Sequence, residues 1–395
     1  MAKIGIYGGT FNPIHNTHLN IAQNAKLQYG LDQIVFIPAG DPPHKCLDSL
    51  STAFDRINMI EIAIKGLSGY SVDLREIERS GKSYTYLTLL EYKDQYPEDE
   101  LFFIMGSDSL DYFDQWKNPD LISSLATVLV AMREGDEKAV IADKMSDFES
   151  KFSGKFRFVE VETSSTASST IREELVLESV PEGVAEYINY HGLYKPSFTY
   201  DDVTNILDKV KDEIKHKRFL HTIGVAHTAA NLSMRWNYPV NKAMIAGALH
   251  DCAKQMSDKE LIDICNRKNI SITDSELICP QLLHGKVAAI ISPKKYNISD
   301  EDILHAISVH TTGCENMNLL DKIIFVSDYI EPGRDKAPRL EYLRQLAFKD
   351  LDLCCYEICH DTIEYLKENP KSMDPATINT FNYFAKLLGK ETYGN

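Results

Sequence analysis

The feature that most constrains the fold is a change of hydrophobic period partway along this 395-residue chain. Up to about residue 195, short apolar runs alternate with longer amphipathic stretches. The apolar runs lie at 3–7, 33–38, 100–105, 126–132 and 156–161, and the helix-like stretches at 18–29, 53–66, 85–96, 168–177 and 182–190. Strands that alternate with helices predict a parallel sheet with right-handed crossovers, so we expect an α/β fold here.

From Asp202 onward the pattern is helical throughout, and no strand alternation of useful length remains. Helices are expected at 202–214, 219–236, 241–249, 258–268, 284–292, 300–309, 319–330, 339–347, 350–367 and 375–388. Pro196 and small polar neighbours interrupt both patterns. We therefore predict two domains, an α/β domain at 1–196 and an all-α domain at 198–395.

Composition limits the partners and the compartment. The net charge of -16 argues against a nucleic-acid partner, which would need a basic face. Neither a signal peptide nor an apolar run of bilayer-spanning length is present, and the eight cysteines form no C-x-x-C pair. We expect a cytoplasmic protein with reduced thiols and no membrane partner. The sequence leaves the oligomeric state open, including a homo-oligomer.

A glycine turn after the first strand is the first candidate site. The segment runs Gly8-Gly9-Thr10-Phe11-Asn12-Pro13-Ile14-His15-Asn16-Thr17-His18. Glycines at the carboxyl end of a parallel strand let the backbone approach a phosphate, and the next helix offers free N–H groups to an anion. Two histidines three residues apart would point at the same phosphates. A tight turn with capping histidines is the structural alternative, and the paired histidines favour the phosphate site.

With these residues the first half resembles the nucleotidyltransferases that carry an HxGH motif, specifically the nicotinate-mononucleotide adenylyltransferases. Further segments match in order: Pro42-Pro43-His44-Lys45, Ser83-Tyr84-Thr85, Gly106-Ser107-Asp108 followed by Trp116, Arg133-Glu134-Gly135, and Ser168-Ser169-Thr170-Ile171-Arg172. The resemblance implies a Rossmann-like domain that transfers AMP from ATP to nicotinate mononucleotide, giving deamido-NAD and pyrophosphate in NAD biosynthesis. It also implies Mg²⁺ bound with the ATP.

The same resemblance implies the roles of individual residues. His15, His18, Lys45 and Arg172 would neutralise the transferring and leaving phosphates, since this chemistry depends on positioning and electrostatics. The nucleotides would contact Gly8, Gly9, Thr10, Phe11, Thr85, Gly106, Asp108, Trp116, Arg133, Ser168 and Ser169. Two departures stand out: Thr17 replaces the family's usual glycine, and Ala167 lacks a hydroxyl that the last motif normally carries. Neither removes a charge, so we expect an active domain with weakened binding at worst.

Histidines and aspartates on helices form the second candidate site. A lone histidine on an apolar helix is usually a packed or capping residue, and His227 and His305 are interpreted in that way. The adjacent His250 and Asp251 differ, because together they offer a nitrogen and a carboxylate oxygen to one cation. With His221 upstream and Asp328 downstream, four protein ligands leave room for water.

The H…HD…D arrangement resembles the HD superfamily of metal-dependent phosphohydrolases. The segments around His250, His284, His310 and Asp328 resemble its symmetrical bis(5′-nucleosyl)-tetraphosphatases. The resemblance implies symmetrical hydrolysis of diadenosine tetraphosphate to two ADP, with iron or another transition metal held by His221, His250, Asp251 and Asp328. His284 and His310 would contact phosphate, transfer a proton or hold a second metal. Arg218 and Arg334 would hold the remaining phosphate charge.

Two alternatives remain for the second half. It could act on another nucleotide, such as a guanine alarmone, as a phosphodiesterase or nucleotidase. It could also be a nucleotide-sensing module that regulates the adenylyltransferase without catalysis. The complete set of four ligands argues against the sensor, because sensing does not require all of them.

Overall fold

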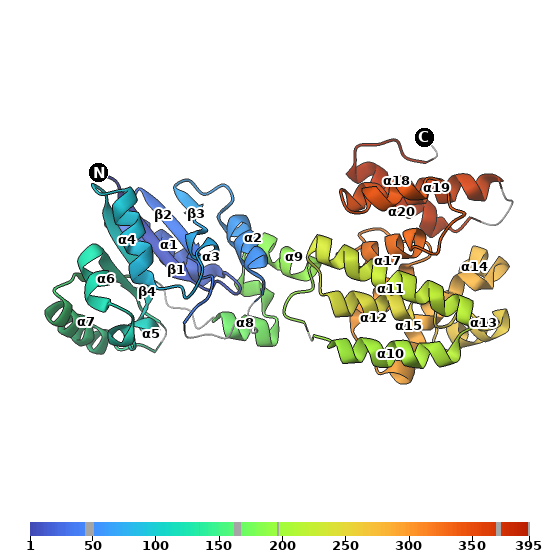
Figure 1. Cartoon of the computed structure of the whole chain (residues 1–395), viewed down its shortest axis with the longest axis horizontal. Coiled ribbons are helices and arrows are strands. Elements are labelled where there is room, and N and C mark those ends of the chain that lie inside the picture. The colour runs from blue at the N-terminus through green and yellow to red at the C-terminus, as the bar shows by residue number, and fades with distance from the viewer. Residues whose placement is uncertain (44–50, 134, 162–166, 196, 369–372, 394–395) are drawn as a thin grey trace. The chain divides into compact units, whose positions relative to one another are not determined.

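The computed structural model describes residues 1–43, 51–133, 135–161, 167–195, 197–368 and 373–393. The chain forms two compact units, Met1–Asn189 and Tyr190–Asn395 (Figure 1). The first is α/β and the second is helical, as the change of period predicts. The limits 1–196 and 198–395, as pieces that fold independently, stay a prediction.

The first unit is built on a parallel sheet. Among its described residues the strands are β1 (Lys3–Gly9), β2 (Gln33–Pro38), β3 (Tyr70–Val72), β4 (Glu100–Gly106), β5 (Thr127–Ala131) and β6 (Phe156–Val159). They lie in the order β3-β2-β1-β4-β5-β6, and every pair is parallel. The order reverses between β1 and β4, which is where open α/β sheets bind ligands.

Helices and short 3₁₀ turns connect the strands of the first unit. They are α1 (Asn16–Tyr29), α2 (Ala53–Ile64), α3 (Arg75–Glu78), α4 (Thr85–Gln95), α5 (Ser107–Leu110), η2 (Phe113–Gln115), α6 (Pro119–Leu125), α7 (Lys138–Phe152), α8 (Ser168–Glu174), η3 (Leu177–Ser179) and α9 (Glu182–Tyr190). The five predicted strands and the five predicted helices are confirmed. The sequence pattern missed β3, which has only three residues, and the helices α3, α5, α6 and α7.

Side chains from alternate strand positions bury both faces of this sheet. On one face Ile6, Phe103 and Val130 pack with residues of α4, α6 and α7. On the other, Ile34 and Phe36 are fully buried, and α1 and α2 contact the strands. Continuous apolar runs such as Gln33–Pro38 are therefore what a parallel sheet covered on both sides requires.

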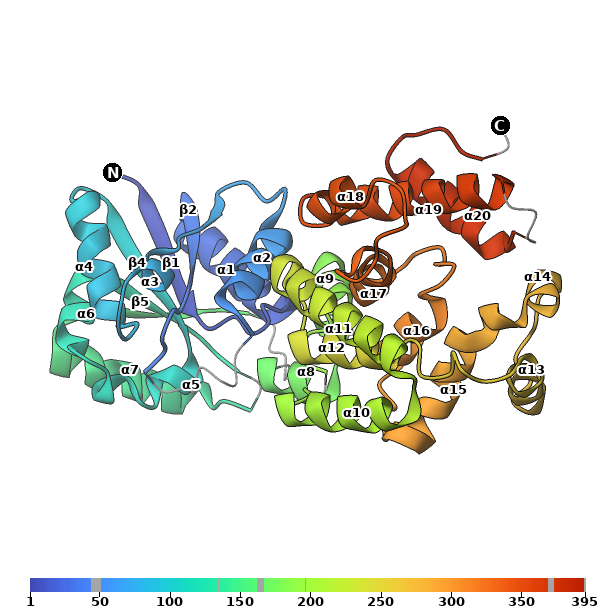
Figure 2. The ribbon, with the colours of Figure 1, turned by 45° about the vertical axis from the view of Figure 1, so that its right-hand side comes forward.

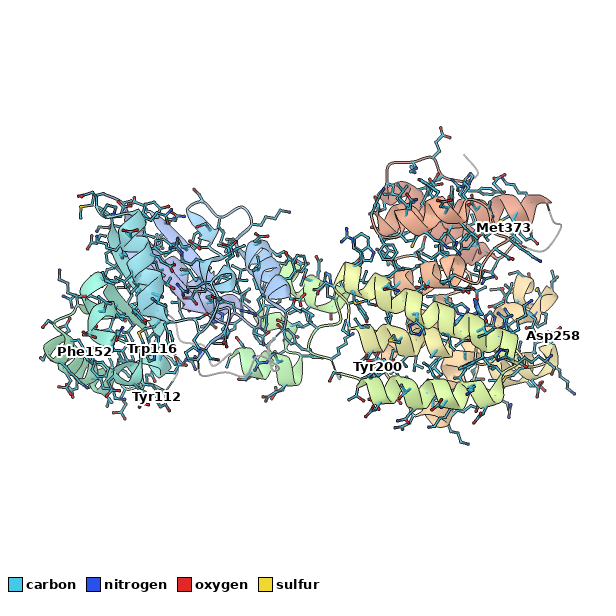
Figure 3. The ribbon with its side chains drawn as sticks, in the orientation of Figure 1. Tyr112, Trp116, Phe152, Tyr200, Asp258 and Met373 are labelled. Carbon is cyan, nitrogen blue, oxygen red and sulfur yellow. The ribbon has the colours of Figure 1, made fainter. Side chains whose placement is uncertain are left out.

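An aromatic cluster lies where η2, α7 and β6 meet. The ring of Phe113 contacts those of Trp116, Phe148, Phe152 and Phe156, with centroids 5.4–5.9 Å apart. Trp116 and Phe152 are labelled in Figure 3. Aromatic pairs at this separation stabilise packing beyond their buried area, so the cluster fixes the backbone on which Trp116 is held.

The second unit is a bundle of helices. Its helices begin with α10 (Tyr200–Glu213), α11 (His216–Trp236), α12 (Val240–Leu249), α13 (Asp258–Arg267), α14 (Asp274–Ile278) and η4 (Pro280–Leu283). They continue with α15 (His284–Tyr296), α16 (Glu301–Val309), α17 (Leu319–Ile330), α18 (Leu340–Leu346), α19 (Leu351–Glu368) and α20 (Pro375–Leu387). All ten predicted helices are confirmed, and the short elements α14 and η4 are additional.

Helix α17 is the centre of this bundle. It packs against α11, α12, α16 and α19 (Figure 2), and nearly all of its residues are buried. Asn318 begins it, with its side chain accepting from the Asp321 N–H and the Asp321 carboxylate accepting from the Asn318 N–H, each at 2.9 Å. Residues on α17 are thus held in a fixed position at the bundle core. Among the described residues, no helix combines the length and apolarity needed to span a bilayer.

Candidate active sites

The paired histidines of the first unit meet at the start of α1. His15 directly precedes this helix, and its backbone N–H donates to Nδ1 of His18 at 3.2 Å. The two ring centroids lie 3.7 Å apart. Because Nδ1 of His18 accepts a hydrogen bond, a neutral His18 carries its proton on Nε2, where it can donate to a phosphate oxygen.

His15 is almost fully buried, and the positive charge of Arg133 acts on it. Burial, assisted by the nearby charge of Arg133, lowers its pKa to about 4. Arg133 itself forms an ion pair with Asp108 at 2.9 Å, and both side chains are about half exposed. Near neutral pH His15 is therefore an uncharged imidazole, and the positive charge beside it comes from Arg133.

The last predicted motif lies against the glycine turn. Oγ of Ser168 donates to the backbone oxygen of Pro13 at 3.0 Å, and Nη1 of Arg172 donates to the backbone oxygen of Asn12 at 2.8 Å. These bonds attach the first turns of α8 to the segment that leads into α1. Residues about 155 positions apart in the sequence are thereby joined at one site.

Two adjoining cavities lie at the carboxyl ends of β1 and β4. The first, about 640 Å³, is lined by predicted residues Gly8, Gly9, Thr10, Phe11, His15, His18, Gly106, Asp108, Trp116, Arg133, Ser168, Ser169 and Arg172. The second, about 470 Å³, is lined by predicted Thr85 together with Gly8, Gly9, Thr10 and Trp116. Thr17 also lines the first cavity, beside the paired histidines. Lys45 lies outside the described residues.

The sequence analysis missed Glu76, which lines the second cavity together with Ser83 of the predicted segment Ser83-Tyr84-Thr85. Glu76 is buried and accepts a hydrogen bond from Thr88 at 2.6 Å, and burial raises its pKa. Oγ of Ser83 accepts from the backbone N–H groups of Gly40 and Asp41, at 3.0 and 3.2 Å. Glu76 has no local sequence signal, because its place in the cavity depends on tertiary contacts such as that with Thr88.

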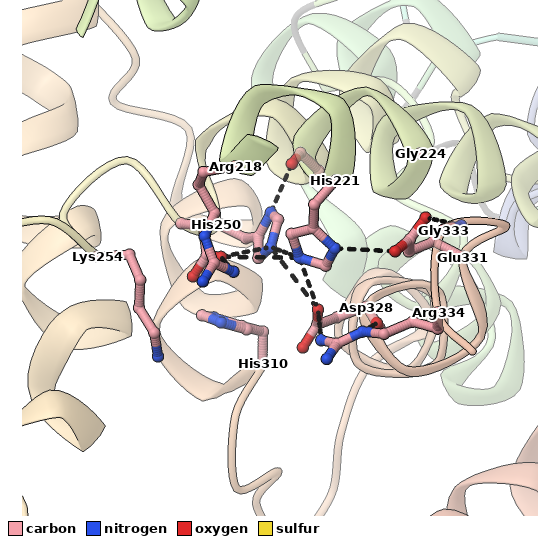
Figure 4. A network of polar contacts seen from close by, with 12 residues as sticks. Arg218, His221, Gly224, His250, Lys254, His310, Asp328, Glu331, Gly333 and Arg334 are labelled. Atoms are coloured by element: carbon pink, nitrogen blue, oxygen red, sulfur yellow. Dashed lines mark hydrogen bonds and ion pairs between the residues drawn. The ribbon is translucent and has the colours of Figure 1, made fainter. Parts of the chain in front are cut away.

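In the second unit, His221 and Asp328 face each other from two helices. Nε2 of His221, on α11, lies 3.1 Å from Oδ1 of Asp328, on α17. Nε2 of His250, at the end of α12, lies 3.3 Å from Nε2 of His221 and 3.8 Å from the same Asp328 oxygen. Oδ2 of Asp251 lies 3.7 and 3.6 Å from these two nitrogens. The four predicted ligands are therefore gathered at one point (Figure 4).

The hydrogen bonds of the Nδ1 atoms of these histidines determine whether their Nε2 atoms can bind a cation. Nδ1 of His250 is 2.6 Å from the backbone oxygen of Gly247, and Nδ1 of His221 is 3.0 Å from Oε1 of Glu331. Each Nδ1 faces an acceptor, so a neutral imidazole keeps its proton there and presents the Nε2 lone pair to a cation. Burial lowers the pKa of His221, but its hydrogen bonds to Asp328 and Glu331 raise it further, so His221 releases a proton when a cation binds. Two lone pairs that converge beside two carboxylates fit a cation between them.

His284 and His310 repeat this arrangement. Their Nδ1 atoms each lie 2.6 Å from a backbone oxygen, of Gln281 and Ile307 respectively. Their Nε2 atoms lie 3.0 Å apart, and Nε2 of His284 lies 3.0 Å from Oδ1 of Asp251. Two groups with metal-ligating geometry, His221/His250/Asp251 and Asp251/His284/His310, thus share Asp251.

Protonation states in the cluster follow from burial and charge. Burial lowers the pKa values of His250 and His284, and burial with the charge of His250 lowers that of His310 to about 4. Burial raises the pKa of Asp251, but His250 and His284 hold it well below its usual range. Neutral imidazoles and ionised carboxylates are the forms that ligate a divalent transition metal.

Both predicted arginines lie at this cluster and pair with its carboxylates. Nη1 of Arg218 lies 2.7 Å from Oδ2 of Asp251, and Nη2 of Arg334 lies 2.7 Å from Oδ1 of Asp328. Their side chains are 36% and 42% exposed, so each guanidinium lies between a ligand carboxylate and solvent. That position suits an arginine that contacts a phosphate entering from solvent.

Two residues close in sequence to the predicted ligands, Glu331 and Lys254, also contact the cluster. Glu331, three residues after Asp328, is buried and holds His221 through Nδ1; it also accepts from the backbone N–H of Gly333 at 2.5 Å. Nζ of Lys254, three residues after Asp251, lies 3.2 Å from Nδ1 of His284. The available signal was closeness in the chain: each follows a predicted ligand by three positions, Lys254 in the turn after α12 and Glu331 directly after α17.

Comparison with known proteins gives a consistent result for both halves. A family model described as "Cytidylyltransferase-like" matches residues 6–174, and one described as "HD domain" matches residues 218–333. A probable nicotinate-nucleotide adenylyltransferase from Lachnoclostridium phytofermentans is 36% identical over 199 residues, which are 49% of this chain and 100% of that protein.

Another relative matches both halves of this chain. A probable nicotinate-nucleotide adenylyltransferase/Ap4A hydrolase from Mycoplasma genitalium is 28% identical over 334 residues, covering 84% of this chain and 88% of that protein. Among solved structures, a predicted HD superfamily hydrolase involved in NAD metabolism from Clostridium acetobutylicum is 36% identical, covering 49% of this chain and 100% of that one, with a TM-score of 0.46.

Proposed function

The chain belongs to the nicotinate-nucleotide adenylyltransferase family and carries an HD domain behind that half, and from this premise we propose two specific reactions. The first unit transfers AMP from ATP to nicotinate mononucleotide. The second hydrolyses diadenosine tetraphosphate symmetrically to two ADP.

One observation carries the first assignment: His15, His18 and Arg172 line a single cavity at the switch point of the sheet. In the proposed reaction the 5′-phosphate of the mononucleotide attacks the α-phosphorus of ATP and expels pyrophosphate. Nε2–H of His18 donates to a phosphate oxygen, while Arg133 and Arg172 supply fixed positive charge. Mg²⁺ bound with the ATP would neutralise charge on the polyphosphate.

We assign the second cavity to the pyridine nucleotide, because it adjoins the first through Gly8, Gly9 and Thr10. Trp116 lines both cavities and supplies an aromatic ring for stacking, and Thr85, the first residue of α4, lines the second cavity. We propose nicotinate rather than nicotinamide as the preferred ring. Its carboxylate suits the N–H groups at the start of α4, where the helix dipole favours an anion.

Product analysis tests the first assignment. The purified full chain with ATP is given either nicotinate mononucleotide or its amide counterpart, and the dinucleotide product is quantified by chromatography. We expect a higher kcat/KM with the nicotinate form. A preference for the amide form would reject the substrate choice, and release of AMP without any dinucleotide would reject adenylyl transfer itself.

The second assignment depends on one observation, the two groups of ligand atoms that share Asp251. His221, His250, Asp251 and Asp328 would hold one cation, and His284 and His310 with the second oxygen of Asp251 would hold another. A metal bound there supplies Lewis acidity and lowers the pKa of a bound water. Arg218, Arg334 and Lys254 would hold the phosphates of the substrate.

We propose iron as the resident metal, as its family suggests, although a mixed nitrogen and oxygen ligand set also accepts Mn, Co, Ni or Zn. Elemental analysis distinguishes the roles of His284 and His310. If both are ligands, wild type holds close to two ions per chain and His284→Ala and His310→Ala each lose one. If they contact phosphate or transfer protons instead, the metal content stays at one and only kcat falls.

The choice of diadenosine tetraphosphate is supported by the name of the M. genitalium relative. The test is to incubate the full chain with this dinucleotide in ¹⁸O-labelled water. Symmetrical cleavage gives ADP as the sole nucleotide, with one labelled oxygen per cleavage event. Equal amounts of ATP and AMP would show asymmetric cleavage, and no turnover beside rapid turnover of a guanine nucleotide would favour the other substrate class.

We also propose a reducing, cytoplasmic setting for both reactions. The seven cysteines in the described part of the chain are all free thiols, and five of them are buried. Alkylation of the freshly isolated, denatured protein followed by mass spectrometry would report all of them as modified. Any disulfide-linked peptide in that sample would contradict the proposal.

A further inference from the structure

A third cluster of metal-ligating side chains lies on α16, α17 and the segment between them. It consists of His305 on α16, Cys314 in the connecting segment and Asp321 on the first turn of α17. One ligand atom from each lies within 4.8 Å of the others. The cluster shares no residue with the two groups that contain Asp251.

The contacts within this cluster are direct. Nδ1 of His305 lies 2.9 Å from Oδ1 of Asp321, and Sγ of Cys314 lies within 4.8 Å of a ligand atom of each. Asp321 is fully buried, and its second oxygen accepts from the backbone N–H of Asn318 at 2.9 Å. The carboxylate is therefore fixed in place, with one oxygen directed at His305.

The cluster is built to stabilise positive charge. The buried carboxylate of Asp321 lies 2.9 Å from Nδ1 of His305. A divalent cation bound to both groups would supply positive charge beside this carboxylate. The side chain of His305 is 50% exposed, so the ion can enter from solvent and keep a water as a further ligand.

The ligand types select the class of ion. A thiolate is a soft ligand that Mg²⁺ and Ca²⁺ avoid, whereas one imidazole, one thiolate and one carboxylate suit Zn²⁺. Zinc–nitrogen and zinc–oxygen bonds of about 2.0–2.1 Å place tetrahedral ligand atoms roughly 3.3 Å apart. The observed 2.9 Å between His305 and Asp321 differs from that by a few tenths of an ångström, which side-chain rotation provides.

We propose that His305, Cys314 and Asp321 bind a thiophilic divalent metal, Zn²⁺ by preference, at a site separate from the HD cluster. His305 is thus a ligand rather than only a packed surface histidine. The ion would brace two helices of the active site, because His310 directly follows α16 and Asp328 lies two turns after Asp321 on α17.

Cobalt substitution tests the proposal, because Co²⁺ bound by a thiolate absorbs in the near ultraviolet and Co²⁺ bound by nitrogen and oxygen alone does not. The HD cluster contains no sulfur ligand, so the band reports the new site even when both sites are filled. The metal-free full chain is titrated with Co²⁺, as wild type, Cys314→Ser and Cys279→Ser. Cys279 is a partly exposed free thiol like Cys314 and serves as the matched control.

We expect wild type and Cys279→Ser at saturating Co²⁺ to show the band with the intensity of one thiolate-bound Co²⁺ per chain, Cys314→Ser to lack it, and excess Zn²⁺ to displace it. His305→Gln replaces a half-exposed side chain and should fold in any case; we expect it to weaken Co²⁺ binding at least tenfold while the thiolate band persists at saturation. Zn²⁺ should also raise the unfolding temperature of wild type more than that of Cys314→Ser. Absence of the band in wild type, its survival in Cys314→Ser, or unchanged affinity in His305→Gln would each overturn the proposal.

Discussion

Replacing Glu331 by glutamine tests how His221 is held toward the cation. The buried carboxylate accepts from Nδ1–H of His221 at 3.0 Å and from the N–H of Gly333 at 2.5 Å. Glutamine keeps the shape but offers a single acceptor oxygen, so one of these two donors would face an NH₂ group. His221 would lose its fixed orientation and the charge that makes its Nε2 a stronger ligand.

The expected magnitude follows from these two bonds. A buried hydrogen bond to a charged group contributes about 1.5–3 kcal/mol. Loss of a carboxylate behind a ligating histidine typically weakens metal binding about 10–100-fold, which is roughly 1.4–2.7 kcal/mol. Because the two ranges agree, we expect Glu331→Gln to raise the dissociation constant for the metal at least tenfold.

The assay is a Mn²⁺ titration of the metal-free full chain, with free Mn²⁺ followed by electron paramagnetic resonance. Glu364→Gln is the control, since Glu364 is exposed on α19 and pairs only with Lys367 at 2.7 Å in the described structure. Gly224→Ala gives an independent perturbation, because a Cβ there would overlap Oε2 of Glu331. It should reproduce the loss of affinity without removing the carboxylate.

The reasoning is refuted if Glu331→Gln binds Mn²⁺ within twofold of wild type. A loss of hydrolysis at unchanged metal affinity would instead assign Glu331 to the substrate through the Gly333–Arg334 turn. Thermal unfolding of both variants in the metal-free state measures how far the lost contacts destabilise the fold itself, and the titration is made well below those unfolding temperatures, where both variants are folded.

Three further predictions concern the first unit and the division of the chain. His18→Ala should lower kcat/KM for adenylyl transfer by about two orders of magnitude or more, because transition-state stabilisation is lost, and should leave hydrolysis intact. Thr17→Gly should preserve or improve adenylyl transfer, and steady-state kinetics check both variants. Burial lowers the pKa of His15 to about 4 from the ordinary 6.5, so between these values the unfolded chain binds a proton that the folded unit does not. The free energy of unfolding should therefore fall as the pH drops from about 6.5 to about 4. Urea unfolding of His15→Gln should show a smaller fall over the same pH range. Fragments 1–196 and 198–395 should each be soluble with one activity, and insolubility of both, or activity only in the full chain, would contradict two independent domains.

The fold could be predicted where the hydrophobic pattern is long and regular. The run Gln33–Pro38 and the amphipathic stretch of α10 are each set by their own residues. Strand β3 could not be found, because Tyr70-Ser71-Val72 becomes a strand only through pairing with β2. Helix α7 was missed because charged residues interrupt its apolar face, of which only Ile141 and Met145 are fully buried.

In the candidate sites, too, local sequence patterns could be predicted and tertiary contacts could not. The motif residues His250 and Asp251 are adjacent in the sequence, so their shared role could be predicted from local spacing. The role of Asp251 between two groups of ligands could not, because it depends on how α15 and α16 bring His284 and His310 to its second oxygen. Glu76 and the His305 cluster depend in the same way on tertiary contacts.

The central claim is that one chain holds two chemically separate sites, and crossing two variants with two substrates tests it most directly. Wild type, His18→Ala and Asp251→Ala, each as the full chain, are given ATP with nicotinate mononucleotide, or diadenosine tetraphosphate alone. We predict that His18→Ala loses only dinucleotide synthesis and that Asp251→Ala loses only ADP formation together with its bound metal. Loss of both activities in either folded variant, or normal hydrolysis by an Asp251→Ala protein free of metal, would contradict the account.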